Sequence, residues 1–265
     1  MTTKQSLSGL RVLVTNDDGI DSSGIKALER IANSITPDVW VVAPKAQQSG
    51  KGHSITFDNI LRVHELSPRK FSVSGTPTDC VFVALGEILK DKKPDLLLSG
   101  INNGSNIADF IGMSGTVGAA FAAASMNIKS MAISQDTQED QNLSKFPLID
   151  HFLPIIIKKL ISFSWPKQTC MNINFPNVKV GEVNGIRIAS QGDMCVTWNV
   201  HKKDDPVGCP YYWLHSTYSY DENANKNSDV VLLEKRKSIT ITALRNKHEF
   251  LECTDKLEEL FASNA

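Results

Sequence analysis

The stretch RVLVTNDDGIDSSGIKALERIANSITPDVWVVAP, residues 11–44, decides the fold of this chain. It opens with a short apolar run, 11–16, which is typical of a buried strand, and it ends with a second such run, 39–43. Between them, residues 22–35 repeat their apolar side chains at helical spacing, behind a serine that can cap the helix. Strand, helix and strand within about 30 residues predict a βαβ unit with parallel strands and a right-handed crossover.

The same alternation continues along the chain. It predicts further strands at 95–98, 131–134 and 170–176, and helices at 77–90, 116–126 and 147–162. Pro154 is expected to kink or break the last helix. Residues 54–74 alternate polar and apolar side chains and predict a small β excursion from the core. We therefore expect an α/β fold, a Rossmann-like three-layer core with a mostly parallel sheet.

The pattern loosens after about residue 180. Several strand-like segments there are separated by polar linkers, and an amphipathic helix follows them. We expect a catalytic core over 1–180, a β-rich extension used in oligomerisation over 181–245, and a C-terminal helix over 246–265.

Composition narrows the class of protein. A formal net charge of -1 over 265 residues argues against binding to a nucleic-acid polymer or to a membrane surface. No uninterrupted apolar run reaches the roughly 18 residues that a membrane span needs. The five cysteines form no CxxC pair, which argues against a zinc knuckle and favours free thiols in a reducing cytoplasm.

Polar residues directly follow the apolar runs, at the carboxyl ends of the predicted strands. Because the strands are expected to be parallel, these ends lie along the same edge of the sheet, which is where ligands of such sheets bind. Carboxylate, hydroxyl and amide oxygens suit a hard cation such as Mg²⁺ or Mn²⁺. The residues that could supply them are Asp17, Asp18, Ser49 and Asn102. The alternative, that Asp17-Asp18-Gly19 is an ordinary turn or helix cap, fits the sequence about equally well.

A second polar site precedes the helix at 116–126. Ser114, Gly115 and Thr116 place amides and hydroxyls at its N-terminus, which predicts an anion site. Plain capping by Ser114 or Thr116 explains them equally well. The segment is not a Walker motif, because no Gly-Lys-Ser/Thr follows at the required spacing. The glycine-rich loop 49–54 is another segment that could face a phosphate.

Taken together, these segments resemble the SurE family of survival proteins, which act as 5′(3′)-nucleotidases. The resemblance is carried, in this order, by VLVTNDDGIDSSGI, VVAPKAQQSG, VSGTPTDCV, PDLLLSGINNGSN and MSGTVGAA. The chain departs from the family pattern at Phe121-Ala-Ala-Ala124, where a glutamate and a glycine are usual, and at Lys237, where a glycine is usual.

The resemblance implies one divalent metal ion per subunit, Mg²⁺ or Mn²⁺, and a nucleoside monophosphate substrate. Asp17 and Asp18 would act in catalysis, and the metal would be held by Asp17, Asp18, Ser49 and Asn102. Phosphate or substrate contacts would come from Asn16, Ser49, Gly50, Asn102, Asn106, Ser114, Gly115 and Thr116. Family members are dimers or tetramers that exchange the β extension, so we expect a homo-oligomer.

Rival functions make different demands on the sequence. A phospho-receiver domain needs an aspartate at the end of its third strand, where this chain has Asn102. A haloacid-dehalogenase-like phosphatase needs two aspartates spaced two residues apart, and Asp17 and Asp18 are adjacent. A non-catalytic Rossmann module would carry a GxGxxG after the first strand. His53 could protonate the leaving group, or it could be a solvated loop residue.

Overall fold

The structure is a computed structural model, and it describes residues 7–137, 146–223 and 225–247. The expected βαβ unit consists of β1 (Arg11–Thr15), α1 (Ser23–Ile35) and β2 (Asp38–Pro44). β1 and β2 are parallel, with Val12 beside Val39. The Ser22 hydroxyl caps α1 by accepting the N–H of Ile25 at 3.4 Å.

A nine-stranded sheet forms the centre of the molecule, in the order β3-β4-β2-β1-β5-β6-β7-β11-β8. The strands from β4 through β7 in this order are parallel to one another. Only the flanks contain antiparallel pairs, β3 with β4 and β11 with β7. The remaining strands are β3 (Val63–Ser67), β4 (Lys70–Val73), β5 (Leu96–Asn103), β6 (Lys129–Gln135), β7 (Thr169–Phe175), β8 (Ile186–Ile188) and β11 (Ile239–Arg245).

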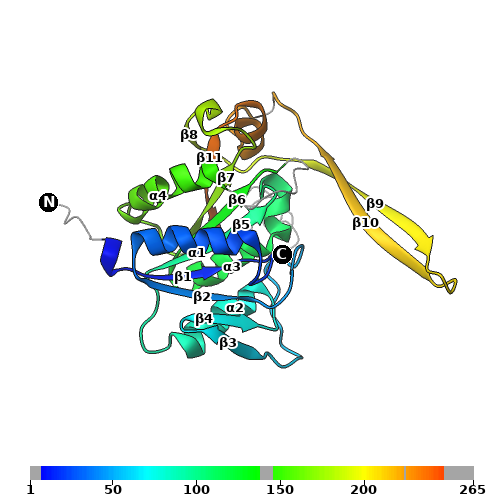
Figure 1. Cartoon of the computed structure of the whole chain (residues 1–265). Coiled ribbons are helices and arrows are strands. Elements are labelled where there is room, and N and C mark those ends of the chain that lie inside the picture. The colour runs from blue at the N-terminus through cyan, green and yellow to red at the C-terminus, as the bar shows by residue number, and fades with distance from the viewer. Residues whose placement is uncertain (1–6, 138–145, 224, 248–265) are drawn as a thin grey trace, which may run out of the picture.

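Helices cover both faces of this sheet and give the expected three layers (Figure 1). α1 and α4 (Pro147–Ile161) pack on one face, around a cluster that includes Val14 and Ile173. α2 (Pro77–Val83) and α3 (Gly115–Ser125) pack on the other face, around a cluster that includes Leu13 and Leu97. No helix within the described residues is long and apolar enough to cross a membrane.

Three local expectations differ from the structure. Residues 54–57 form no strand, and β4 pairs in parallel with β2, so the segment 54–74 supplies the edge of the main sheet instead of a separate excursion. Pro154 does not break α4, which runs from Pro147 to Ile161 through this half-buried proline with one backbone N–H donor fewer. The helix expected over 77–90 is α2 followed by a π-helical turn, η2 (Ala84–Ile88).

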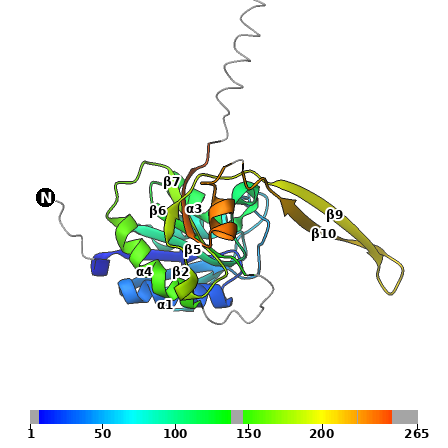
Figure 2. The ribbon, with the colours of Figure 1, turned by 90° about the horizontal axis from the view of Figure 1, so that it is seen from above.

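The β-rich extension is smaller than the range 181–245 suggested. β8 and β11 belong to the main sheet, because β11 pairs with β7 and β8 pairs with β11. Among the described residues, β9 (Cys195–Asp204) and β10 (Pro210–Ser219) pair only with each other, and they form a hairpin that projects away from the core in both views (Figures 1 and 2). Of the helix expected over 246–265, residues 248–265 lie outside the described residues.

Close packing of α1 on β5 depends on Gly24. A Cβ at this position would lie 2.1 Å from the backbone oxygen of Ile101, which has no freedom to move aside. We expect Gly24→Ala to lower the free energy of unfolding by about 3 kcal/mol, the upper range for overpacking. Urea denaturation measures this change. The control is Gly86→Ala, an exposed helical glycine with open space around its Cβ, which should leave stability equal or slightly higher.

Candidate metal and phosphate site

The loops that follow β1 and β2 are joined by backbone hydrogen bonds. The N–H of Ile20 donates to the carbonyl of Pro44 at 2.8 Å, and the N–H of Gln48 donates to the carbonyl of Asp17 at 2.7 Å. Within the first loop, the Asn16 amide nitrogen donates to the carbonyl of Gly19 at 3.0 Å and to the Ser22 hydroxyl at 2.8 Å. Asn16 therefore shapes the turn that presents the two aspartates.

Asp17 is buried against the first turn of α3. Its Oδ1 accepts a hydrogen bond from the Thr116 hydroxyl at 2.5 Å, and the backbone N–H of Thr116 also donates to this carboxylate. A Cβ on Gly115 would lie 2.8 Å from the Cβ of Asp17, so the two segments are in van der Waals contact. Burial raises the pKa of Asp17, and the hydrogen bonds from Thr116 oppose that rise.

Asp18 follows Asp17 in the chain and contacts Asn103, the last residue of β5. Burial and, secondarily, the charge of Asp17 raise the pKa of Asp18 to about 6, while a hydrogen bond from the backbone N–H of Asn103 lowers it. Two adjacent carboxylates with raised pKa values are costly when both are charged. A bound cation would reverse that cost by favouring the ionised forms.

Neutral oxygens are present on the two segments that hydrogen-bond to this pair through Gln48 and Asn103. The Asn102 amide nitrogen donates to the carbonyl of Gly104 at 2.7 Å, which leaves its side-chain oxygen as the atom to face a cation. The Ser49 hydroxyl accepts from Gln47 at 3.1 Å. The side-chain oxygen of Asn16 is buried and has no hydrogen-bond partner among the described residues.

These residues fit a hard divalent ion. Within 7–137, 146–223 and 225–247, no group of three His, Cys, Asp or Glu side chains could hold a metal. Zinc sites usually combine several such groups, whereas Mg²⁺ and Mn²⁺ accept one or two carboxylates with neutral oxygens and water. Asp17 and Asp18 with Asn102 and Ser49 are a donor set of the second kind.

The sequence allowed either Ser114 or Thr116 to cap the N-terminus of α3, and in the structure Ser114 is the cap. The Ser114 hydroxyl accepts the N–H of Val117 at 3.1 Å and caps the helix, while Thr116 uses its hydroxyl on Asp17. The loop that contains Gly50 lies against this segment, because the N–H of Gly52 donates to the carbonyl of Met113 at 3.0 Å. Ser114, Gly115 and Thr116 thus adjoin both the aspartate pair and the glycine-rich loop.

The structure gives defined neighbours to two further residues that the sequence singled out, Asn106 and His53. Asn106 is buried in a polar network on β6 and β7, where its amide nitrogen donates to Ser134 at 2.8 Å and its carbonyl accepts from Asn172 at 2.7 Å and Asn174 at 3.1 Å. The His53 ring packs 6.2 Å from Phe121, five residues beyond Thr116 along α3. Burial lowers the pKa of His53.

The start of α2 also reaches the site, at residues that were not predicted from the sequence to lie there. Thr76 and Asp79 form a reciprocal capping box, and Pro77 would lie 3.2 Å from a Cβ on Gly115. The spacing Thr-x-x-Asp is a known N-terminal signal that could have indicated the box. Its contact with Gly115 depends on the fold, so no local signal could have shown it.

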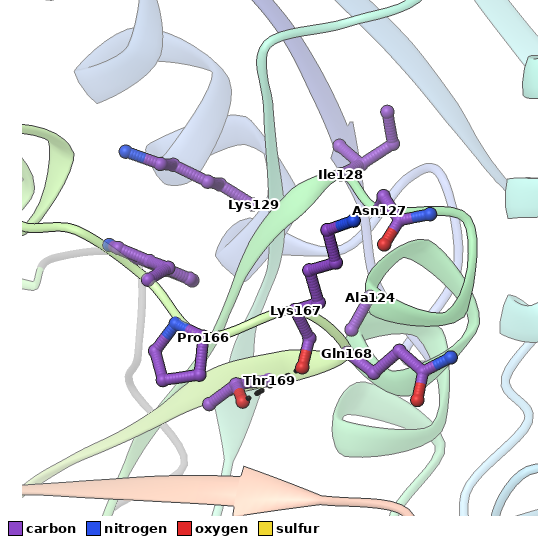
Figure 3. A pocket seen from close by; sticks show the side chains of 9 residues that line it. Ala124, Asn127, Ile128, Lys129, Pro166, Lys167, Gln168 and Thr169 are labelled. Carbon is purple, nitrogen blue, oxygen red and sulfur yellow. Dashed lines mark hydrogen bonds between the residues drawn. The ribbon is translucent and has the colours of Figure 1, made fainter.

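Figure 3 shows a separate pocket of about 150 Å³. It lies at the amino-terminal ends of β6 and β7, whereas the aspartate pair follows the carboxyl end of β1. Its walls include Lys129, at the start of β6, and Thr169, at the start of β7. Ligands of parallel α/β sheets bind at the carboxyl ends of the strands, so this pocket is on the wrong side for that role.

Comparison with known proteins agrees with the resemblance in the sequence. The family model described as "Survival protein SurE" matches residues 12–197. The 5′-nucleotidase SurE of Parvibaculum lavamentivorans is 47% identical over 214 residues, which cover 80% of this chain and 77% of the relative. The 5′-nucleotidase SurE of Paramagnetospirillum magneticum is 42% identical over 216 residues, which cover 82% and 83%.

The structure leads to the same family. The crystal structure of the SurE protein from Aquifex aeolicus superposes with a TM-score of 0.79 at 33% identity, and the match covers 94% of this chain and 99% of that one. The range 12–197 that the family model matches contains the aspartate pair, the loop after β2, the end of β5 and the start of α3. This chain belongs to the SurE family of survival proteins.

Proposed function

We propose that this chain is a metal-dependent 5′-nucleotidase that hydrolyses nucleoside 5′-monophosphates to a nucleoside and inorganic phosphate. One Mg²⁺ or Mn²⁺ ion per subunit would be held by Asp17, Asp18, Ser49 and Asn102. The observation that carries the proposal is the contact between Asp17 and Thr116 at 2.5 Å, which joins a carboxylate pair to a helix N-terminus. A cation and an anion can therefore be bound side by side.

The bound ion would polarise a phosphoryl oxygen and lower the pKa of an attacking water. Asp18 is half-buried whereas Asp17 is buried, so Asp18 is the carboxylate more open to such a water and would accept its proton. Asp17 is held by Thr116 and keeps a fixed position against α3. The Ser114 hydroxyl and the backbone N–H of Gly115, at the start of α3, would stabilise negative charge on the phosphoryl oxygens.

A homo-oligomer in the cytoplasm is part of the same proposal. Trp198, Val200, Tyr212 and Leu214 share one face of the β9–β10 hairpin and are 52–68% exposed. An isolated two-stranded hairpin with such a face is marginally stable in water, which favours its burial against a second copy as a dimer or tetramer.

Phosphate release from a panel of nucleotides tests the function. We expect release from nucleoside 5′-monophosphates, loss of at least about 95% of it with EDTA, and recovery with added Mn²⁺ or Mg²⁺. The panel also contains 3′-nucleotides and polyphosphate, so that it defines the substrate range. Activity that persists in EDTA would contradict the metal role. Tight binding of a monophosphate without any phosphate release would favour a binding or signalling module.

A further inference from the structure

Asp229 is a fully buried carboxylate that the proposed reaction does not use. Burying a carboxylate is costly unless hydrogen bonds compensate for its lost hydration. Here Oδ1 accepts the N–H groups of Gly192 and Val230, both at 2.9 Å, and Oδ2 accepts the N–H of Ala108 at 3.1 Å. One side chain thus joins three backbone segments.

Two of these segments connect the β9–β10 hairpin to the core, one before β9 and one after β10, and we call them the hairpin roots. Gly192 precedes β9, and Asp229 and Val230 lie on the segment that returns from β10. The roots are paired, since the N–H of Asp229 donates to the carbonyl of Ser190 at 2.9 Å. The Tyr218 hydroxyl, at the end of β10, donates to Glu234 at 2.8 Å and fixes the returning strand to the core.

The third segment begins η3 (Ala108–Met113), which leads directly to Ser114 at the N-terminus of α3. Ala108 has φ +46°, a left-handed conformation that costs an alanine about 1 kcal/mol. Its N–H bond to Asp229 and the 3.0 Å bond from Gln191 to its carbonyl hold it there.

The next two residues of η3 also contact the hairpin roots. The Asp109 carboxylate accepts the N–H of Met194, just before β9, at 2.8 Å. The ring of Phe110 meets the Tyr218 ring edge-on, with centroids 5.7 Å apart. Consecutive residues of η3 therefore contact the segment that leads into β9 and the end of β10, and η3 itself ends at the predicted phosphate site.

We propose that Asp229 is a positioning residue that fastens η3 to the hairpin roots and thereby fixes Ser114, Gly115 and Thr116 for binding the phosphoryl group. The proposal rests on the proposed function in so far as residues 114–116 bind phosphate. The hairpin and residues 114–116 would then move together. A second copy bound to the hairpin would therefore alter the position of the phosphate-binding residues through η3.

Asp229→Asn tests this in the full chain, because it keeps the size of the side chain and replaces one acceptor oxygen by a nitrogen. We expect amide hydrogen exchange in residues 108–116 to quicken by about tenfold or more. The inhibition constant of inorganic phosphate should rise by about fivefold or more, while the dissociation constant of Mn²⁺ stays within about twofold. If Asp229 only stabilised the fold, the exchange rate, the phosphate inhibition constant and the Mn²⁺ dissociation constant would all change together with the melting temperature.

The matched control is Asp205→Asn, at the hairpin turn. There the Asp205 carboxylate also accepts backbone N–H groups, those of Val207 at 2.9 Å and Cys209 at 2.8 Å. This variant should leave both the amide hydrogen exchange of residues 108–116 and the inhibition constant of inorganic phosphate unchanged. Equal effects in both variants, or wild-type behaviour of Asp229→Asn, would overturn the proposal.

Asp109→Ala serves as a second variant if Asp229→Asn does not fold. Asp109 is exposed, and its substitution removes the hydrogen bond from Met194. It should raise both the exchange rate and the inhibition constant less strongly, and no change in either would overturn the proposal. If the wild type releases no phosphate, the proposed function fails, and the exchange measurement still tests whether Asp229 positions η3.

Discussion

Asp18→Asn is expected to lower kcat for a nucleoside 5′-monophosphate by at least about 10³-fold, and also to raise the melting temperature of the metal-free protein. The first effect follows because a bound metal supplies several kcal/mol of stabilisation to the transition state and Asp18 is one of the two charged ligands proposed for it. The second follows because the substitution removes a charge that burial and the neighbouring Asp17 both disfavour.

The second effect has a defined pH dependence. The pKa of Asp18 is about 6 in the folded protein and close to its ordinary value of 3.8 when the chain is unfolded. Between these values the folded state binds more protons than the unfolded state, so the stability of the metal-free wild type falls as the pH rises through this window. The melting temperatures of wild type and Asp18→Asn should therefore differ at pH 7.5 and converge near pH 4.

Calorimetry in EDTA and steady-state kinetics with Mn²⁺ measure the two effects. Asp21→Asn is the control, because Asp21 is an exposed carboxylate in the same loop. It should behave like the wild type in both assays. Near-normal activity of Asp18→Asn would remove Asp18 from the metal site, and a lower melting temperature in EDTA would contradict repulsion within the aspartate pair.

The part of the fold that could be predicted from the sequence is the part set by neighbouring residues. β1, α1 and β2 have uninterrupted apolar patterns and a serine cap, so their type and order follow from 11–44 alone. The grouping of strand ends then follows from parallel pairing, which is why Asp17 and the loop before Ser49 could be expected together. Their backbone bond, Gln48 to Asp17, is present.

The rest depends on pairings between distant segments. β11 and β10 are both strand-like in sequence, yet β11 pairs with β7 in the main sheet and β10 pairs only with β9. Nothing local distinguishes them, because strand formers fit any half-buried pleated surface. Asp229 was missed for the same reason, since two of its three hydrogen-bond donors come from segments far along the chain.

Gly115→Ala is expected to lower kcat/KM by at least about 10²-fold, the cost of moving a reacting group by about 1 Å. The added methyl would meet the Cβ of Asp17 at 2.8 Å and the ring of Pro77 at 3.2 Å, both on packed elements. α3 would have to move away from Asp17, which weakens the hydrogen bond from Thr116. Steady-state kinetics and Mn²⁺ titration measure the effect. Gly112→Ala is the control, because its Cβ would meet nothing within 4 Å.

A double-mutant cycle distinguishes this cause from general overpacking. Thr116→Val removes the hydroxyl that donates to Asp17 while keeping the side chain's volume. If Gly115→Ala acts by breaking that same contact, the double variant should be only slightly less active than the worse single variant, because contacting residues are not additive. Losses that multiply would instead mean that Gly115 and Thr116 act on Asp17 independently, and the 2.5 Å bond would then not be what sets the aspartate's position.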